Sequence, residues 1–290
     1  MRTMLPDNLL PLEYPSPAVK WAGGKADVAD QILPLLPADV RARRWHEPFV
    51  GGAALFLRIA PRKAILSDTC ADLITLYEVL QTVGDESPFW AQLVFLETLH
   101  NAAHAGPGPK ANYEEVRKAF NARTLLSNEH RAAAFLYLNK AGFNGLHRVN
   151  EAGEFNVPFG DAKRIQFNRE TLSSVGRAMQ GAELLACSFE SVLERATPGD
   201  VVYFDPPYLG TFSDYSSRFG IPEHIELARV FRALDAKRVI VVLSINDTPY
   251  IKELYQGLDI TPVTAPRAIG ARGSSRGYVR ELVIRGKCRG

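Results

Sequence analysis

Cysteine is scarce in this sequence, and long apolar runs are missing. The three cysteines, Cys70, Cys187 and Cys288, lie far apart in a chain of 290 residues. Their odd number and wide spacing argue against a disulfide framework or a cysteine metal cluster, and favour a reducing compartment such as the cytoplasm. No apolar stretch approaches the ~20 residues that span a membrane. Residues 1–17 lack the apolar core of a signal peptide.

Net charge is also small, because opposite charges nearly cancel. Lys and Arg number 34 against 32 Asp and Glu, and the 46% hydrophobic content is ordinary for a globular protein. Residues 267–290 hold seven basic residues and one acid, a charge of +6, which leaves −4 on the rest. Their glycine- and serine-rich loop carries Arg272 and Arg276, which we interpret as contacts to phosphate groups. A solvated tail is the alternative.

Short apolar runs alternate with helical patterns over most of the chain. Runs that predict strands cover residues 45–50, 64–68, 183–187, 201–205 and 239–245. Helical patterns cover residues 26–36, 53–59, 72–83, 168–179 and 222–234. This alternation predicts an α/β fold with a parallel sheet covered on both faces.

The alternation stops between residues 85 and 167. Helical patterns there cover residues 112–121 and 129–140, and residues 148–157 predict a hairpin closed by a glycine-containing turn. We therefore expect one catalytic domain made of residues 18–84 and 168–290. An inserted, mainly helical subdomain is expected at 85–167, and an N-terminal extension at 1–17.

An acid, two prolines and an aromatic residue follow the predicted strand 201–205, as Asp205-Pro206-Pro207-Tyr208. Ligands of open α/β sheets bind outside the carboxyl ends of the strands. The prolines lack N–H groups, so this corner is rich in acceptors: the Asp205 carboxylate and the Pro206 carbonyl. Such acceptors suit a planar amine, because holding its hydrogens aims the nitrogen lone pair, while Tyr208 can stack on the ring. A plain proline turn is the alternative.

A second motif, residues 47–56, runs from a strand through a glycine turn into a helix. The turn lets a ligand approach the backbone at a helix N-terminus, and we assign Phe49 and Gly51 to a cofactor. Asp68 ends the next predicted strand about 20 residues on, where an acid accepts hydrogen bonds from ribose hydroxyls. The alternative is a strand–helix crossover without a ligand, with Asp68 as a helix N-cap.

A third motif, Lys20-Trp21-Ala22-Gly23-Gly24-Lys25, precedes a predicted helix. It lacks the spacing of a P-loop. It nevertheless combines a stacking face, a tight turn and two cations, and a cofactor carboxylate could lie against Lys25. A helix start with a half-buried tryptophan is the alternative.

Along the chain the Lys-Trp motif comes first, then the glycine turn, the insert and Asp-Pro-Pro-Tyr, and in this order the motifs resemble the Dam-like family of D12-class DNA adenine-N6 methyltransferases. The likeness extends through residues 132–140, 142–150 and 153–160, and covers about residues 18–285. It implies a Rossmann-like methyltransferase sheet with an inserted target-recognition subdomain that carries a β-hairpin. It also implies S-adenosylmethionine as cofactor and the N6 amine of adenine in double-stranded DNA as the target.

The resemblance assigns roles residue by residue. The family's cofactor contacts fall on Trp21, Lys25, Asp68 and Asp205, and its adenine pocket on Asp205, Pro206 and Tyr208. Its recognition region falls on Lys20, Phe143, Asn144, Leu146, Arg148, Asn150 and Pro158. Arg148 matches a guanine-reading arginine, and Leu146 and Pro158 match contacts to a thymine methyl, as direct readout requires. Lys20 matches a second guanine contact, and Phe143 an aromatic wedge beside the extruded base.

Two positions depart from the family pattern. Ala53 stands where the turn usually has its last glycine, and residues 161–163 lack an aromatic that some GATC-specific members carry. The matching recognition residues favour a site that contains GAT, such as GATC. We expect base flipping and direct attack by a metal-free monomer. Two alternatives stay open: an amino methyltransferase acting on cytosine N4 or RNA adenine, and a DNA-binding protein with a lapsed active site.

Overall fold

A computed structural model describes residues 14–102, 108–209, 219–266 and 278–289. The chain divides into two compact units. The sheet unit comprises Met1–Tyr14, Gly23–Thr69 and Gly181–Gly290, and the helical unit comprises Pro15–Ala22 and Cys70–Gln180. No helix among the described residues is long and apolar enough to cross a membrane.

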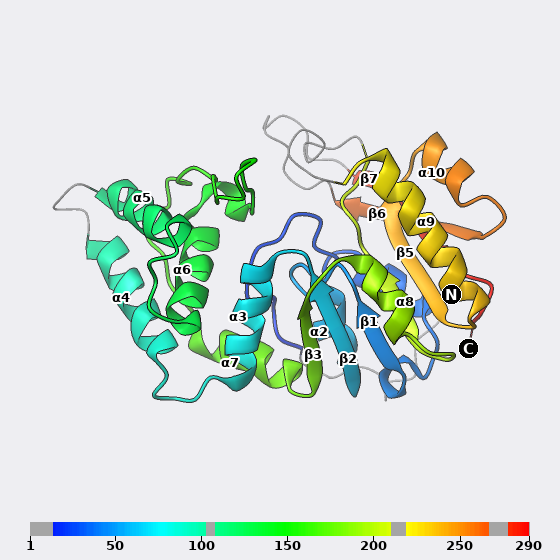
Figure 1. The fold of residues 1–290 in the computed structure, drawn as a ribbon, viewed down its shortest axis with the longest axis horizontal. Helices are drawn as coiled ribbons and strands as arrows, with labels where there is room; N and C mark the ends of the chain where they lie inside the picture. The colour runs from blue at the N-terminus through cyan, green and yellow to red at the C-terminus, as the bar shows by residue number, and fades with distance from the viewer. Residues whose placement is uncertain (1–13, 103–107, 210–218, 267–277, 290) are drawn as a thin grey trace. The chain divides into compact units, whose positions relative to one another are not determined.

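One seven-stranded sheet, in the order β3-β2-β1-β4-β5-β7-β6, forms the sheet unit (Figure 1). Strands β1 to β5 pair in parallel, and β7 runs antiparallel between β5 and β6. The parallel order 3-2-1-4-5 is that of Rossmann-like folds, which confirms the α/β prediction. The strands are β1 (Arg44–Glu47), β2 (Lys63–Asp68), β3 (Ala182–Ala186), β4 (Val201–Phe204), β5 (Ile240–Asn246), β6 (Asp259–Pro266) and β7 (Tyr278–Arg285).

The sequence pattern does not predict the last two strands. Strand β6 contains Pro262 and lies at the edge of the sheet, where a missing N–H donor is tolerated. Strand β7 holds Arg280, Glu281 and Arg285, which read from the sequence as part of a basic tail. The second half of β7 is buried, because it pairs with both β5 and β6. The first half of β7 pairs with β6 and is more exposed.

Helices of the sheet unit are short, apart from one. The 26–36 pattern forms a helix only from Ala29 and passes into a 3-10 turn that contains Pro34. The α-helices are α1 (Ala29–Ile32), α2 (Ala54–Ile59), α8 (Val192–Arg195), α9 (Ile221–Ala236) and α10 (Pro249–Leu254). The 3-10 turns are η1 (Leu33–Leu35), η2 (Val40–Ala42) and η5 (Phe189–Ser191).

Side chains alternate between the two faces of the sheet. One face packs on α8, α9 and α10, of which α8 and α9 lie in front of the sheet in Figure 1. Its strand residues are apolar: Val202, Phe204, Val241, Leu243, Ile245, Leu282 and Ile284. Besides the apolar Val201, Ile240, Val242 and Val283, the alternate positions carry a set of mostly polar side chains that we call the polar row: Trp45, Glu47, Tyr203, Asp205, Ser244, Asn246 and Glu281.

The helical unit packs around α6, which is buried along almost its whole length. A Cβ atom on Gly176 would lie 2.1 Å from the Leu80 carbonyl oxygen, so α7 and α3 approach each other closely. This packing makes the compact unit wider than the expected 85–167 subdomain. Its helices are α3 (Ala71–Thr82), α4 (Pro88–Ala102), α5 (Gly108–Asn121), α6 (Asn128–Ala141), η4 (Phe143–Gly145) and α7 (Arg169–Met179).

At residues 148–157, where a hairpin is expected, the chain folds back on itself with a single β-bridge instead of two regular strands. Val149 and Phe155 form a single antiparallel bridge. The Asn150 amide donates to the Glu154 carbonyl at 2.9 Å, and Gly153 turns the chain with φ +79°. Such a φ favours glycine, as the turn prediction requires.

Candidate active site

The Asp-Pro-Pro-Tyr segment leaves the sheet directly after β4. Because β1, β2, β4 and β5 run in parallel, their carboxyl ends meet at the same edge. This edge gathers Glu47 from β1, Asp68 from β2 and Asn246 from β5 beside Asp205. The catalytic corner and the glycine turn therefore belong to one site within the sheet unit.

Lys25 is the cation of this site. Its ammonium lies 2.7 Å from Asp205 Oδ1 and donates to the Gly23 carbonyl at 2.6 Å. It also lies 5.0 Å from the centre of the Tyr208 ring. Lys25 is only 3% exposed. The sequence analysis predicts Lys25 against a cofactor carboxylate, and in this structure Lys25 pairs with the Asp205 carboxylate.

Burial shifts the acids of the site toward their protonated forms. It raises the pKa of Asp205 to about 6, although the Lys25 charge opposes this rise. Burial also raises the pKa of Glu47 to about 8, and the charge of Asp205 adds to the effect. The Glu47 carboxyl accepts a hydrogen bond from Trp45 Nε1 at 2.8 Å. At neutral pH Glu47 therefore holds its proton while Asp205 is mostly ionised.

The site holds more acids than cations. Glu47, Asp205 and Glu281 are buried or nearly so, and their charges influence one another or a shared neighbour. Lys25 is the buried cation beside them among the described residues. Buried like charges repel strongly. Because Glu47 keeps its proton at neutral pH, the repulsion acts between Asp205 and Glu281, and a positively charged ligand would relieve it.

The glycine turn is fastened to Asp68. The Gly51 amide donates to Asp68 Oδ2 at 3.1 Å, and Gly51 has φ +44°. Phe49 stacks on Phe189 with 5.4 Å between ring centres and meets Phe219 edge-on at 5.5 Å. Phe49 is half-buried, so part of its ring forms an exposed apolar surface beside the turn.

Ala53, the departure from the family pattern, adopts the backbone that a glycine favours. It is fully buried at the start of α2 with φ +58°. A left-handed alanine costs roughly 1–2 kcal/mol, of which the greater freedom of an unfolded glycine offsets a part. We expect Ala53→Gly to raise the free energy of unfolding by about 1 kcal/mol in urea titrations. Ala54→Gly, one residue into the helix, should lower it by a similar amount; equal effects would contradict the account.

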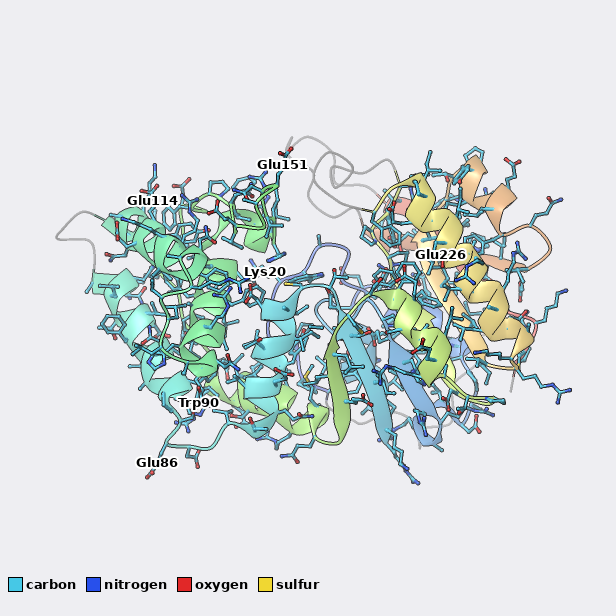
Figure 2. All side chains as sticks on the ribbon, in the orientation of Figure 1. Lys20, Glu86, Trp90, Glu114, Glu151 and Glu226 are labelled. Atoms are coloured by element: carbon cyan, nitrogen blue, oxygen red, sulfur yellow. The ribbon has the colours of Figure 1, made fainter. Side chains whose placement is uncertain are left out.

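The recognition residues of the helical unit point to solvent. Phe143 is 44% and Leu146 37% exposed. The residues between them and beyond, Gly145, Phe155 and Val157, are buried and anchor the segment. The other exposed candidates are Lys20 (Figure 2), Asn144, Arg148, Asn150 and Pro158. Arg148 is oriented by Asn156, whose Oδ1 accepts from Arg148 Nε at 2.7 Å.

Two residues that the sequence analysis did not single out hold this segment together. Asn139 accepts from the Lys20 amide at 3.0 Å and donates to the Lys20 and Gly145 carbonyls at 2.9 and 2.8 Å. His147 stacks on Trp21 with 5.3 Å between ring centres. The Lys-Trp motif and the recognition segment are therefore one packed structure within the helical unit.

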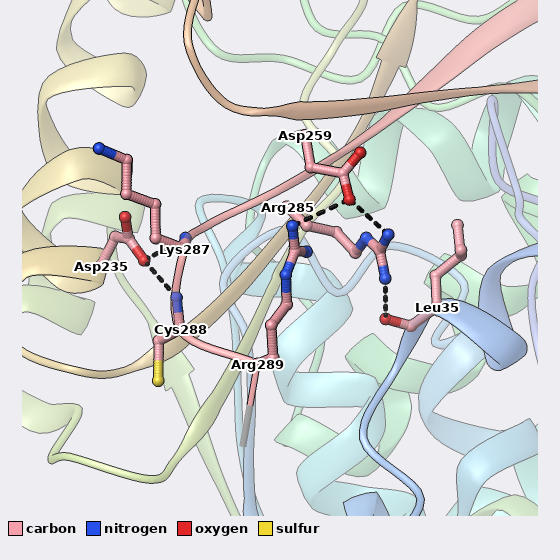
Figure 3. Close-up of polar contacts among 7 residues, drawn as sticks. All are labelled: Leu35, Asp235, Asp259, Arg285, Lys287, Cys288 and Arg289. Carbon is pink, nitrogen blue, oxygen red and sulfur yellow. Dashed lines mark hydrogen bonds and ion pairs between the residues drawn. The ribbon is translucent and has the colours of Figure 1, made fainter.

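The basic C-terminal residues divide between different places. Arg285 and Arg289 converge on Asp259, with nitrogen–oxygen distances of 2.5 and 2.9 Å (Figure 3). Asp235 accepts from the backbone amides of residues 287 and 288. Arg285 pairs in register with Val242 at the beginning of β5, away from its carboxyl end. The ion pairs of Arg285 and Arg289 with Asp259 therefore stabilise the sheet. Arg272 and Arg276 lie outside the described residues.

Metal ligands are not grouped in the part of the chain that the structure describes. No set of three or more His, Cys, Asp or Glu side chains there could hold an ion.

A Rossmann-like sheet with an Asp-Pro-Pro-Tyr corner at the carboxyl end of β4 is the arrangement expected of a methyltransferase of amino groups. Residues 21–269 match the model of the D12 class N6 adenine-specific DNA methyltransferases. The chain belongs to this family and is an adenine-specific DNA methyltransferase that uses a methyl donor.

Similar proteins match nearly the whole chain. The type II methyltransferase M1.LlaDCHI of Lactococcus lactis subsp. cremoris is 33% identical over 279 residues, 92% of this chain and 94% of that protein. The DNA adenine methylase of Salmonella typhi is 34% identical over 271 residues, 91% of this chain and 93% of that protein. The DNA N-6-adenine-methyltransferase of Escherichia phage P1 is 34% identical over 279 residues, 93% of this chain but 35% of that protein.

The sequence analysis did not identify Glu47 and Glu281 as functional residues. Glu47 is visible as the acid that ends the strand Arg44–Glu47 directly before the glycine turn, which is a signal of function. Glu281 is visible as the single acid among seven bases in residues 267–290. Neither signal says that the two acids reach the same edge of the sheet, because β7 itself is not predicted.

Proposed function

We propose that the protein transfers a methyl group from S-adenosylmethionine to N6 of an adenine flipped out of double-stranded DNA. The observation that carries the proposal is the buried Lys25–Asp205 pair beside Tyr208, 2.7 Å apart, at the carboxyl end of β4. A base in a duplex cannot reach a pocket of this kind without leaving the stack. We further propose that the protein acts as a monomer in the cytoplasm, where its substrate DNA would lie.

Asp205 and the Pro206 carbonyl act on the amine as hydrogen-bond acceptors. Holding the two amine hydrogens draws the nitrogen toward tetrahedral geometry and directs its lone pair at the methyl group. The ionised Asp205 carboxylate stabilises the positive charge that develops on the nitrogen. Lys25 keeps Asp205 ionised and in place, and Tyr208 offers a ring face for stacking.

The acid surplus of the site fits S-adenosylmethionine, whose sulfonium and ammonium groups are cationic. When bound, this cofactor supplies an electrophilic methyl group. Of the chain's own residues, Asp68 and the Gly51 turn would hold the ribose side of the cofactor. Phe49 offers a flat apolar contact, and Trp21 offers a stacking face in the helical unit.

Base analysis of the labelled product tests this function. The purified protein is incubated with duplex DNA and S-adenosylmethionine carrying a tritiated methyl group, and the DNA is digested to nucleosides. We expect the label in N6-methyladenine. Label in N4-methylcytosine, or transfer only to RNA, would support a different amino methyltransferase, and a cofactor titration without binding would support a lapsed enzyme.

Arg148 is proposed to read a guanine of a GAT-containing site such as GATC. A bidentate arginine contributes about 1–3 kcal/mol of discrimination. We expect Arg148→Ala to methylate sites with other bases at that position roughly 5- to 100-fold more readily relative to the preferred site. Sequencing of methylated adenines in DNA from a methylation-free host measures this preference. Arg164→Ala, an exposed arginine outside the hairpin, should keep the wild-type preference; equal loss of preference would refute the assignment.

A further inference from the structure

Glu281 of β7 is a buried acid that the reaction described above does not use. It is 7% exposed, and its Oε2 atom has no hydrogen-bond partner among the described residues. An unpartnered carboxylate oxygen in a protein interior is costly and is kept where it serves a function more often than stability. Glu281 therefore calls for an explanation beyond packing.

The register of the sheet places Glu281 at the catalytic edge. It pairs directly with Asn246, the last residue of β5, in the antiparallel ladder between β5 and β7. Paired residues of an antiparallel ladder lie on the same face of the sheet. Both belong to the polar row, which also contains Asp205.

Asn246 and Glu281 both approach the Asp-Pro-Pro-Tyr corner. Asn246 Nδ2 donates to the Leu209 carbonyl at 2.8 Å, which holds the residue directly after Tyr208. Burial raises the pKa of Tyr208, and the charges of Asp205 and Glu281 raise it further, so the Glu281 carboxyl lies near the Tyr208 phenol. One strand pair thus touches the corner at its backbone and at its aromatic ring.

We propose that Glu281 is a positioning residue for the methyl transfer. It accepts the hydrogen bond of the Tyr208 hydroxyl and so fixes the plane in which the ring meets the target adenine. Asn246 holds the following backbone, so that the ring cannot move with the chain beyond Leu209. This inference rests on the proposed function, because it assigns Tyr208 to the adenine pocket.

Three variants separate a hydrogen bond from a charge and from a purely structural role. Glu281→Leu removes the acceptor, and Tyr208→Phe removes the donor. We expect each to lower kcat by about 10-fold, since loss of orientation of roughly 1 Å can reduce a rate by up to 10²-fold. The double variant should be no slower than either single variant. Glu281→Gln keeps an acceptor oxygen and should recover most of kcat.

Thermal unfolding tests for a purely structural role, because loss of a structural residue would lower the Tm. Glu281→Gln removes a buried charge and keeps an acceptor for the Tyr208 hydroxyl, so it should keep or raise the Tm, and a fall in its Tm would mark a structural role. Glu226→Gln, an acid on α9 that pairs with Arg229, serves as the control and should match the wild type in both measurements.

Each other result overturns the inference. Additive losses in the double variant would show that Glu281 does not act through Tyr208. An equal loss in Glu281→Gln and Glu281→Leu would assign the effect to charge, and a fall in Tm that parallels the loss of kcat would make Glu281 structural. A wild-type protein without transfer to adenine would instead overturn the proposed function, and this inference with it.

Discussion

Replacing Asp205 with alanine is expected to lower kcat by at least about 10³-fold, the scale of a lost electrostatic contact in a transition state. The carboxylate lies 2.7 Å from Lys25 and is the one charged acceptor of the Asp-Pro-Pro-Tyr corner. Without it, the amine keeps a neutral carbonyl acceptor, and nothing at that position balances the charge that forms on nitrogen. Asp205→Asn keeps the shape and one acceptor, so about a 10²-fold loss is expected.

Single-turnover rates with saturating cofactor measure this loss apart from binding. Asp200→Asn is a matched control, because Asp200 lies at the opposite end of β4 and pairs with His46 at 3.0 Å. It should lower stability and leave the rate of transfer within a factor of two. Transfer by Asp205→Ala within tenfold of the wild type would refute the assigned role.

The pH profile of the wild type gives the same residue a second signature. Asp205 acts as an acceptor only when ionised, and its pKa is raised to about 6. The value of kcat/KM should therefore fall below about pH 6. Lys25 lowers the pKa of Asp205, so Lys25→Met should move this fall to higher pH.

The sequence predicts the catalytic half of the site because its residues are close in the chain. Asp205, Pro206 and Tyr208 form one motif after a strand that is continuously apolar, and such a strand is recognisable without a structure. Five parallel strands follow from the same reasoning and are confirmed. The contact between Lys25 and Asp205 could not be predicted in this way. The two residues are 180 positions apart in the sequence, and only the folded chain brings them together.

Strand β7 shows where the sequence misleads. Its charges add to a basic stretch, and a sum over residues 267–290 suggests a surface that binds phosphates. In the folded chain Arg285 and Arg289 neutralise Asp259, while Glu281 enters the catalytic edge. A strand rises about 3.3 Å per residue, so Glu281 and Arg285 pair with different parts of β5, at Asn246 and Val242, which no local charge count can reveal.

Replacing Glu47 with glutamine is expected to remove a fall in stability between pH 6 and pH 8. In the folded protein the pKa of Glu47 is about 8, against 4.5 for a free side chain. The folded state therefore binds a proton over this range that the unfolded state has already lost. Since the slope of stability with pH follows the excess of protons bound by the unfolded state, the free energy of unfolding must decrease as pH rises.

Between pH 6 and pH 8 the loss is about 2 kcal/mol, because each unit contributes up to about 1.4 kcal/mol and the folded Glu47 carboxyl is half ionised at pH 8. Urea unfolding at pH 6 and pH 8 should show this loss in the wild type and little of it in Glu47→Gln. The pKa of His46 is lowered by burial, so that residue adds stability as pH rises and cannot produce the loss. Asp205 has its pKa near 6 and contributes chiefly below the tested range. The difference between Glu47→Gln and the wild type therefore isolates Glu47, and parallel slopes in the two proteins would show that its carboxyl is ionised in the folded state.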